Sequence, residues 1–197
     1  AWRPSVSFNW PVARRVGLFG IWIVLEGILG WFYNWADSIL LGAYLGVKEL
    51  GLYRTGTAAV VMVFGVFLNP ILQILYSAFS RLQNDLNRFK RFFSKAVRII
   101  VSIALPTAMG IFFLSEYIEV LIFGSKWAGV GRVIAFIAIV QGWSWFATGI
   151  NYEAYRAIGR PDIFPKLMIF SLLYYLPVYF YFAPKGLDVF LWARLFL

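Results

Sequence analysis

The sequence predicts an all-α protein, a polytopic bundle of transmembrane helices. The chain has 197 residues, of which 61% are hydrophobic and only 14% are charged, whereas a soluble domain is about 45–50% apolar and about 25% charged. The apolar residues form five continuous runs, each about long enough to cross the hydrocarbon core of a bilayer, and a shorter sixth run. Within the runs apolar and polar residues do not alternate, so transmembrane strands are not expected.

The apolar runs follow one another as helices joined by short polar segments. In chain order they cover residues 17–44, 52–79, 98–115, 133–151, 163–182 and 189–197. The sixth run has about ten residues, whereas a complete span needs about twenty, and the chain begins with Ala1 rather than Met. We therefore expect residues 1–197 to be one bundle of five complete spans and a truncated sixth, within a longer protein.

The basic residues predict how the spans are oriented. A net charge of +9 would suggest nucleic acid for a soluble protein, but here the basic residues lie between apolar runs, so no nucleic-acid partner is expected. Twelve of the 18 lie in alternate segments, namely Arg3, Arg14, Arg15, Arg81, Arg88, Lys90, Arg91, Lys95, Arg98, Arg156, Arg160 and Lys166. The other six are Lys48, Arg54, Lys126, Arg132, Lys185 and Arg194. The first set is predicted to be cytoplasmic.

Residues 80–98 form a basic amphipathic segment within the cytoplasmic set. Its apolar residues recur at helical spacing and are Leu82, Leu86, Phe89, Phe93 and Val97, with basic residues mostly between them. Such a helix suits the inner membrane surface, where it contacts lipid headgroups. A linker that only sets the topology is the alternative.

Cysteine and histidine are both absent from the chain. Their absence removes disulfides, thiol chemistry, histidine-ligated zinc and Ser–His or Cys–His nucleophilic pairs. Carboxylates, lysine, arginine and tyrosine remain as possible catalysts, but we expect no metal, no cofactor and no enzymatic activity.

Two carboxylates lie inside the first predicted span. Glu26, Tyr33, Asp37 and Tyr44 are separated by 7, 4 and 7 residues, which places them within about 40° of one another around a helix. Intramembrane carboxylates usually face a bundle interior or a hydrated cavity. Glu26 and Asp37 are therefore candidate residues of a transport path. The alternative is that either carboxylate pairs with a basic residue of a neighbouring helix for assembly.

Polar residues also recur at helical spacing in the second and fourth runs. In the second run they are Asn69, Gln73 and Ser77, and in the fourth they are Gln141, Ser144, Thr148, Asn151 and Tyr155. Taken singly, such residues more often form hydrogen bonds between helices than bind a ligand. Because three helices each have one polar face, we expect those faces to line a common hydrated cavity.

Four motifs follow one another in the sequence: "DSILLGAYLGVKELGLY" (37–53), "AFSRLQND" (78–85), "LPTAMGIFFLSEYIEVLIFGSKW" (105–127) and "AIGRPD" (157–162). In this order they resemble the motifs of the polysaccharide transporters, the oligosaccharide flippases of the multidrug/oligosaccharidyl-lipid/polysaccharide exporter superfamily. The resemblance covers roughly residues 20–170. The chain departs from the family pattern in "LYSAFSR", which lacks a proline that the family usually has there.

The resemblance implies a fold and a function. The chain would be most of the C-terminal half of a transporter with two helical bundles, in the cytoplasmic membrane of a bacterium. That transporter would move lipid-linked oligosaccharide or polysaccharide precursors, carried on a polyprenyl diphosphate, across the membrane by alternating access. Its partners would be this substrate, membrane lipids and polysaccharide assembly machinery.

Arginines near the span ends are candidates for the diphosphate, because a guanidinium binds phosphate oxygens bidentately. Arg54 and Arg156 are preferred, since Thr57 and the polar face ending at Tyr155 adjoin them. Arg98 and Arg132 are better interpreted as interfacial residues that snorkel.

Two other functions remain open. A cation-coupled multidrug antiporter would use Glu26 or Asp37 as its coupling carboxylate. A membrane-embedded glycosyltransferase or ligase is less favoured, because it would need catalytic carboxylates in a sizeable exterior loop. The acids in the short exterior segments are Glu49, Glu116, Glu119 and Asp188.

Overall fold

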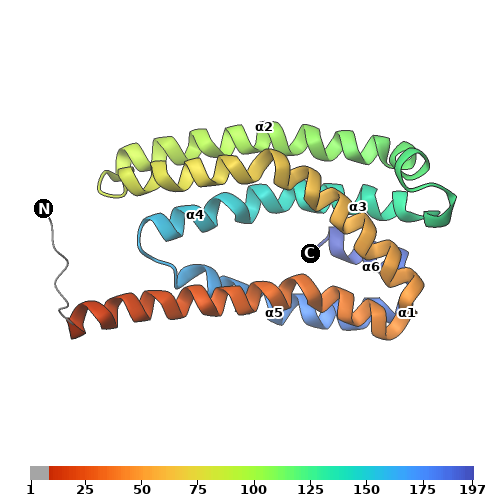
Figure 1. The fold of residues 1–197 in the computed structure, drawn as a ribbon, viewed down its shortest axis with the longest axis horizontal. Helices are drawn as coiled ribbons and strands as arrows, with labels where there is room; N and C mark the ends of the chain where they lie inside the picture. Colours follow the sequence, from red (N-terminus) through yellow and green to blue (C-terminus); the bar gives the residue numbers. More distant parts are fainter. Residues whose placement is uncertain (1–8) are drawn as a thin grey trace, which may run out of the picture.

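The computed structural model describes residues 9–197, which form an elongated bundle of helices without a β-strand (Figure 1). The helices are α1 (Trp10–Leu82), α2 (Leu86–Ile118), α3 (Val130–Ser144), α4 (Ile150–Ala157), α5 (Ile163–Phe182) and α6 (Leu187–Leu195). Four stretches are long and apolar enough to cross a membrane: α1, α2 with the residues up to Phe123, α3 with α4, and α5 with the residues up to Lys185. The predicted class, an all-α multi-pass membrane protein, is confirmed.

The first two predicted helices belong to one element, α1, which bends back at Gly46 (Figure 1). Gly46 has φ +82° and ψ −177°, in the region that only glycine adopts without strain. We call residues 10–45 the first arm and residues 47–82 the second arm. The polar segment between the two apolar runs is therefore helical on both sides of a single turning residue.

The helices cross the bundle in alternating directions (Figure 1). At one end lie the start of the first arm, the turn between the second arm and α2, and the connection from α4 to α5. At the other end lie the Gly46 bend and the connections that precede α3 and α6. Within residues 9–197 this arrangement agrees with the two sets of basic residues in the sequence, most of which lie inside the helices rather than in the connections. Arg3, a member of the first set, lies outside the described residues.

The core lies mainly where the second arm, α2 and α3 pack together. On α2 its residues recur every three or four positions and are Ala96, Ile100, Ala104, Ala108 and Ile111. Three of these residues are alanines, which are small enough to let the neighbouring helix approach closely, as is common between membrane helices. Many large apolar side chains of the bundle point outward instead, as expected for a surface that faces lipid.

Residues 80–98, for which the sequence predicts a basic amphipathic segment at the inner membrane surface, are divided between two helices. Residues 80–82 end α1, a turn follows, and Leu86 begins a continuous helix that runs to Ile118. The rings of Phe89, Phe92 and Phe93 pack around the buried ring of Phe79, with centroid distances of 5.1, 5.3 and 6.0 Å. Most of the apolar side of the segment is thus used to join α2 to the second arm, while its basic side chains stay exposed.

The start of α3 is capped by a carboxylate from the end of α2. Gly129 N donates to Glu119 Oε1 at 3.1 Å, and Gly131 N donates to Glu119 Oε2 at 2.5 Å. Both amides lie in the first turn of a helix, where backbone N–H groups have no partner within the helix. Glu119 is therefore a helix-capping residue, although the sequence places it among the acids of an exterior segment.

Replacing Glu119 with alanine is expected to lower the free energy of unfolding by about 1–2 kcal/mol, the usual cost of a lost cap. Thermal unfolding of the protein in detergent micelles measures this. The control is Glu116→Ala, because Glu116 is exposed one turn earlier, and its effect is expected within about 0.5 kcal/mol. Equal effects of the two substitutions would contradict the capping role.

Candidate functional site

The eight residues that the sequence predicts for the transport path lie in three places. Glu26 and Arg156 come together at the end of the bundle where α4 ends. Asp37 and Arg54 lie near the Gly46 bend, where both interact with Ser38. The four amides, Asn69, Gln73, Gln141 and Asn151, are spread along the second arm, α3 and α4.

Three helical segments contribute to a group that we call the Arg156 cluster: Glu26, Tyr76, Tyr152, Glu153 and Arg156. The Arg156 guanidinium carbon lies 5.1 Å from the centre of the Tyr76 ring and 5.0 Å from that of Tyr152. Arg156 Nη1 lies 3.4 Å from Glu153 Oε2. The Glu26 carboxyl group lies near the Tyr152 hydroxyl, where the first arm packs against α4.

The Arg156 cluster is polar, largely shielded from solvent and incompletely paired. Only 12% of the Glu153 side chain and 30% of the Arg156 side chain are exposed. Arg156 Nε is buried and has no hydrogen-bond partner among residues 9–197. With both carboxylates ionised, the cluster has two negative charges and one positive charge. It therefore offers hydrogen-bond donors, acceptors and two aromatic rings in one place.

Sequence reasoning found only Glu26 and Arg156 of this cluster. Tyr152 and Glu153 precede Arg156 by four and three residues, so one turn of α4 brings all three together. That spacing in the sequence could have identified Tyr152 and Glu153 as neighbours of Arg156. Tyr76 comes from the second arm, and no sequence signal indicates that its ring lies near Arg156.

The polar stripe predicted along the fourth run is interrupted. A π-helical turn, Trp145–Gly149, separates α3 from α4 and changes the rotation of one relative to the other. Three polar side chains of the stripe bond to carbonyls of their own helix, at 2.7–2.8 Å, and these are Ser144, Thr148 and Asn151. These hydrogen bonds are local rather than interhelical.

The polar residues of the second arm face outward. Asn69 and Gln73 are exposed, and within residues 9–197 neither side chain has a hydrogen bond to another helix. Gln141 on α3 is half-buried. The common cavity that the sequence predicts for these side chains stays a prediction.

Asp37 lies at the centre of a second group, the Asp37 clasp, formed with Ser38, Tyr53 and Arg194. Asp37 accepts hydrogen bonds from the Tyr53 hydroxyl of the second arm and from Ser38 Oγ, and it forms an ion pair with Arg194 of α6. Only 4% of Asp37 is exposed. This arrangement fits the assembly role that the sequence left open. Arg194 was assigned to an exterior segment, because the sequence does not reveal its partner.

Arg54 also joins the two arms of α1 near the bend. Its guanidinium carbon lies 4.2 Å from the centre of the Trp35 ring, and its Nη1 lies 3.5 Å from Ser38 Oγ.

The other two residues of the predicted first-span stripe are tyrosines. The Tyr33 ring meets Tyr175 of α5 edge-on at 5.3 Å, whereas Tyr44 is half-exposed. Three of the four residues of the predicted first-span stripe thus face neighbouring helices.

The connection between α4 and α5 has its own ion pairs, close to the Arg156 cluster in the chain. Arg160 Nε and Lys166 Nζ lie 3.0 and 2.7 Å from the two carboxylate oxygens of Asp162. Hydrogen bonds from Arg160 and then from Lys166 hold the pKa of Asp162 below its usual range. These two cations therefore already have a carboxylate partner.

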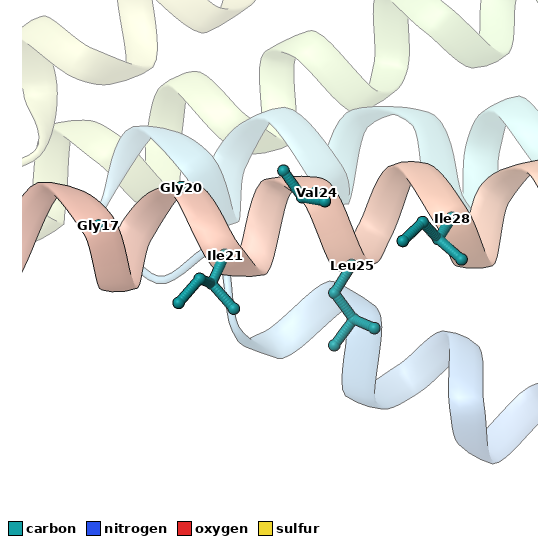
Figure 2. Close-up of a pocket in the computed structure, with 6 residues that line it drawn as sticks. All are labelled: Gly17, Gly20, Ile21, Val24, Leu25 and Ile28. Carbon is teal, nitrogen blue, oxygen red and sulfur yellow. The ribbon is translucent and has the colours of Figure 1, made fainter.

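An apolar hollow lies along the first arm (Figure 2). Its lining residues are Gly17, Gly20, Ile21, Val24, Leu25 and Ile28. No polar side chain lines it, so it suits a lipid chain or an apolar helix better than a saccharide. A second hollow near the bend includes the charged residues Lys48, Glu49, Arg132 and Asp188. Residues 9–197 contain no cluster of three or more His, Cys, Asp or Glu side chains that could hold a metal ion.

Known proteins resemble this chain over most of its length. The lipopolysaccharide biosynthesis protein WzxC of Escherichia coli (strain K12) is 25% identical over 177 residues, which are 89% of this chain and 36% of that protein. The succinoglycan biosynthesis transport protein ExoT of Rhizobium meliloti (strain 1021) is 22% identical over 139 residues, 71% of this chain and 28% of that protein. The probable low-salt glycan biosynthesis flippase Agl15 of Haloferax volcanii is 24% identical over 128 residues, 64% of this chain and 27% of that protein.

The chain spans about a third of the length of these curated relatives. No solved structure matches it significantly. A family model described as polysaccharide biosynthesis protein matches residues 1–131, about two thirds of the chain. The chain therefore belongs to the polysaccharide biosynthesis protein family.

Proposed function

We propose that the protein containing this chain is a flippase in the cytoplasmic membrane of a bacterium. It moves lipid-linked oligosaccharide or polysaccharide precursors across that membrane by alternating access between two helical bundles. The Arg156 cluster supports this proposal most directly, because it places donors, acceptors and aromatic rings together among the membrane-crossing helices and leaves Arg156 Nε without a hydrogen-bond partner among residues 9–197. Relatives named as a transport protein and a flippase in glycan biosynthesis agree with it.

The chemistry of the substrate explains why such a cluster is useful. A glycan needs hydrogen-bond partners to leave water, and a diphosphate needs positive charge. A prenyl tail needs neither and stays in lipid, against the outward apolar side chains of the helices. Arg156 and Arg54 are the proposed contacts for the diphosphate. They lie towards opposite ends of the bundle, so a substrate that crosses the membrane meets one near each end.

The remaining predicted residues have different proposed roles. Glu26 contributes to the Arg156 cluster as an acceptor for glycan hydroxyl groups. Asn69, Gln73, Gln141 and Asn151 are proposed to line the path between the two ends. Asp37 is proposed to serve assembly, because its oxygens are already occupied by Tyr53, Ser38 and Arg194.

Replacing Arg156 with alanine is expected to slow transport at least about tenfold, which corresponds to the loss of about 1.4 kcal/mol of interaction with the substrate. The measurement uses the full-length protein in proteoliposomes and follows transfer of a fluorescent lipid-linked saccharide between leaflets. Arg160→Ala is the matched control, because Arg160 lies four residues later and pairs with Asp162. Its transfer rate is expected to stay near that of the parent.

Three outcomes would contradict the proposal. Unchanged transfer by Arg156→Ala would remove Arg156 from the path. Export of cationic drugs along an ion gradient, without transfer of lipid-linked saccharide, would favour a multidrug antiporter. Apparent transfer of the fluorescent saccharide that occurs only when a donor sugar is supplied would indicate an enzyme.

A further inference from the structure

The Asp37 clasp joins three helical segments through one carboxylate. Asp37 belongs to the first arm, Tyr53 to the second arm, and Arg194 to α6. The Arg194 guanidinium carbon also lies 5.5 Å from the centre of the Tyr53 ring, so the arginine contacts both partners. Arg194 and Asp37 are 157 residues apart in the chain. The clasp is therefore the charged connection between α6 and the bend of α1.

The ion pair between Asp37 and Arg194 is shielded from solvent, and apolar contacts hold α6 in place around it. The side chains of Arg194 and Asp37 are only 19% and 5% exposed, and α6 is held beside them by apolar packing. The Phe190 ring packs against Tyr53 at 5.9 Å and against Tyr179 of α5 at 4.9 Å. Phe190 and Leu191 are both buried, and α6 contacts α3. Thus α6 packs against α3, and α3 leads through the π-helical turn into α4.

The first arm turns away from the second arm at Gly46, where a single residue sets the direction. Asp37 lies nine residues before this bend, and Glu26 lies eleven residues further along the first arm. Eleven residues of helix extend about 17 Å. A change of about 10° in the direction of the arm at Asp37 would move Glu26 by about 3 Å, enough to separate its carboxyl group from Tyr152.

We propose that Arg194 is a positioning residue, which acts through Asp37 to hold the first arm in the direction that brings Glu26 into the Arg156 cluster. Its effect on transport rests on the proposed function, but its effect on the direction of the arm does not. Arg194 itself contacts neither Glu26 nor Arg156. Tyr53 binds Asp37 from the second arm, whereas Arg194 binds it from α6, which packs against α3 and α5.

The test removes both charges at once, so that no buried charge is left without a partner. The double variant Asp37→Asn/Arg194→Gln is made in the full-length protein, and Arg194→Lys, which keeps the positive charge, is made beside it. The chain contains no cysteine, so within it spin labels attach only at introduced cysteines, once any cysteines elsewhere in the protein are replaced. Double electron–electron resonance then measures distances between pairs of labels.

One pair of labels reports the direction of the first arm. It joins Gly20, where an added side chain meets nothing within 4 Å, to Ile158, which is exposed just after α4. Gly20 lies 17 residues from Asp37, about 25 Å along the helix, so a change of about 10° shifts it by about 4 Å. The control pair joins Gly110 on α2 to Trp143 on α3, which are also open or exposed.

The double variant is expected to shift and broaden the Gly20–Ile158 distance distribution while leaving the Gly110–Trp143 distribution unchanged. Arg194→Lys is expected to keep the parental distribution at both pairs. A parental Gly20–Ile158 distribution in the double variant would overturn the proposal, and so would an equal shift in Arg194→Lys. If the shift occurs but the parent moves no lipid-linked saccharide, only the proposed function fails.

Discussion

Replacing Arg194 with methionine is expected to lower the free energy of unfolding by about 3–5 kcal/mol. The substitution preserves much of the side-chain volume but leaves the Asp37 carboxylate buried without its cation, and an uncompensated buried charge is costly. Unfolding of the detergent-solubilised protein, followed by temperature or denaturant, measures the change. This loss is a large fraction of the free energy of unfolding of a typical protein, which is about 5–15 kcal/mol.

The chain offers a matched control for this substitution. Arg132 Nη1 lies 2.8 Å from Asp188 Oδ2, also an arginine–aspartate pair, but both side chains are more than half exposed. Because water already solvates both partners, Arg132→Met is expected to cost less than about 1 kcal/mol. Similar losses for the two methionine variants would show that burial of the Asp37 clasp has no energetic consequence.

Replacing Gly142 with valine is expected to cost about 3 kcal/mol. A Cβ atom at Gly142 would lie 2.7 Å from Ala108 Cβ, and neither α3 nor α2 can relieve this contact by a rotation of a side chain. Small residues at such positions let membrane helices approach each other, and overpacking forces the backbones apart. Thermal unfolding of the purified protein measures the loss.

Gly110→Val is the control for this second substitution. Gly110 lies on α2 two residues after Ala108, and a Cβ atom there meets nothing within 4 Å. The change is therefore expected to stay within about 0.5 kcal/mol. If Gly142→Val lowered the free energy of unfolding no more than Gly110→Val does, α2 and α3 would not approach each other closely at Gly142.

The sequence predicted the class of fold because hydrophobic runs of sufficient length dictate membrane helices. It also predicted which ends of the helices lie together, since the basic residues alternate between two sets of segments. It did not predict that one glycine would replace the first connection. Gly46 has a positive φ, whereas Gly42 and Gly51 do not, and this difference depends on how the two arms pack.

The candidate site was predicted only in part, and for a physical reason. Helical spacing places Glu26 and Asp37 on the same side of the first arm, but it does not identify what lies opposite them. Their partners, Tyr152 and Arg194, come from helices more than 100 residues away. The stripe from Gln141 to Asn151 assumed a uniform helix, and the π-helical turn Trp145–Gly149 changes that register.

The most direct test of the account asks whether a lipid-linked saccharide occupies the Arg156 cluster. Tyr76→Cys is introduced into the full-length protein after any cysteines outside residues 1–197 have been replaced, and it is labelled in proteoliposomes with a water-soluble maleimide with and without the lipid-linked saccharide. Asn84→Cys, in the exposed turn that follows the same arm, is the control. We predict that the lipid-linked saccharide slows labelling at position 76 and leaves labelling at position 84 unchanged. Equal labelling rates at position 76 with and without the saccharide would contradict the account.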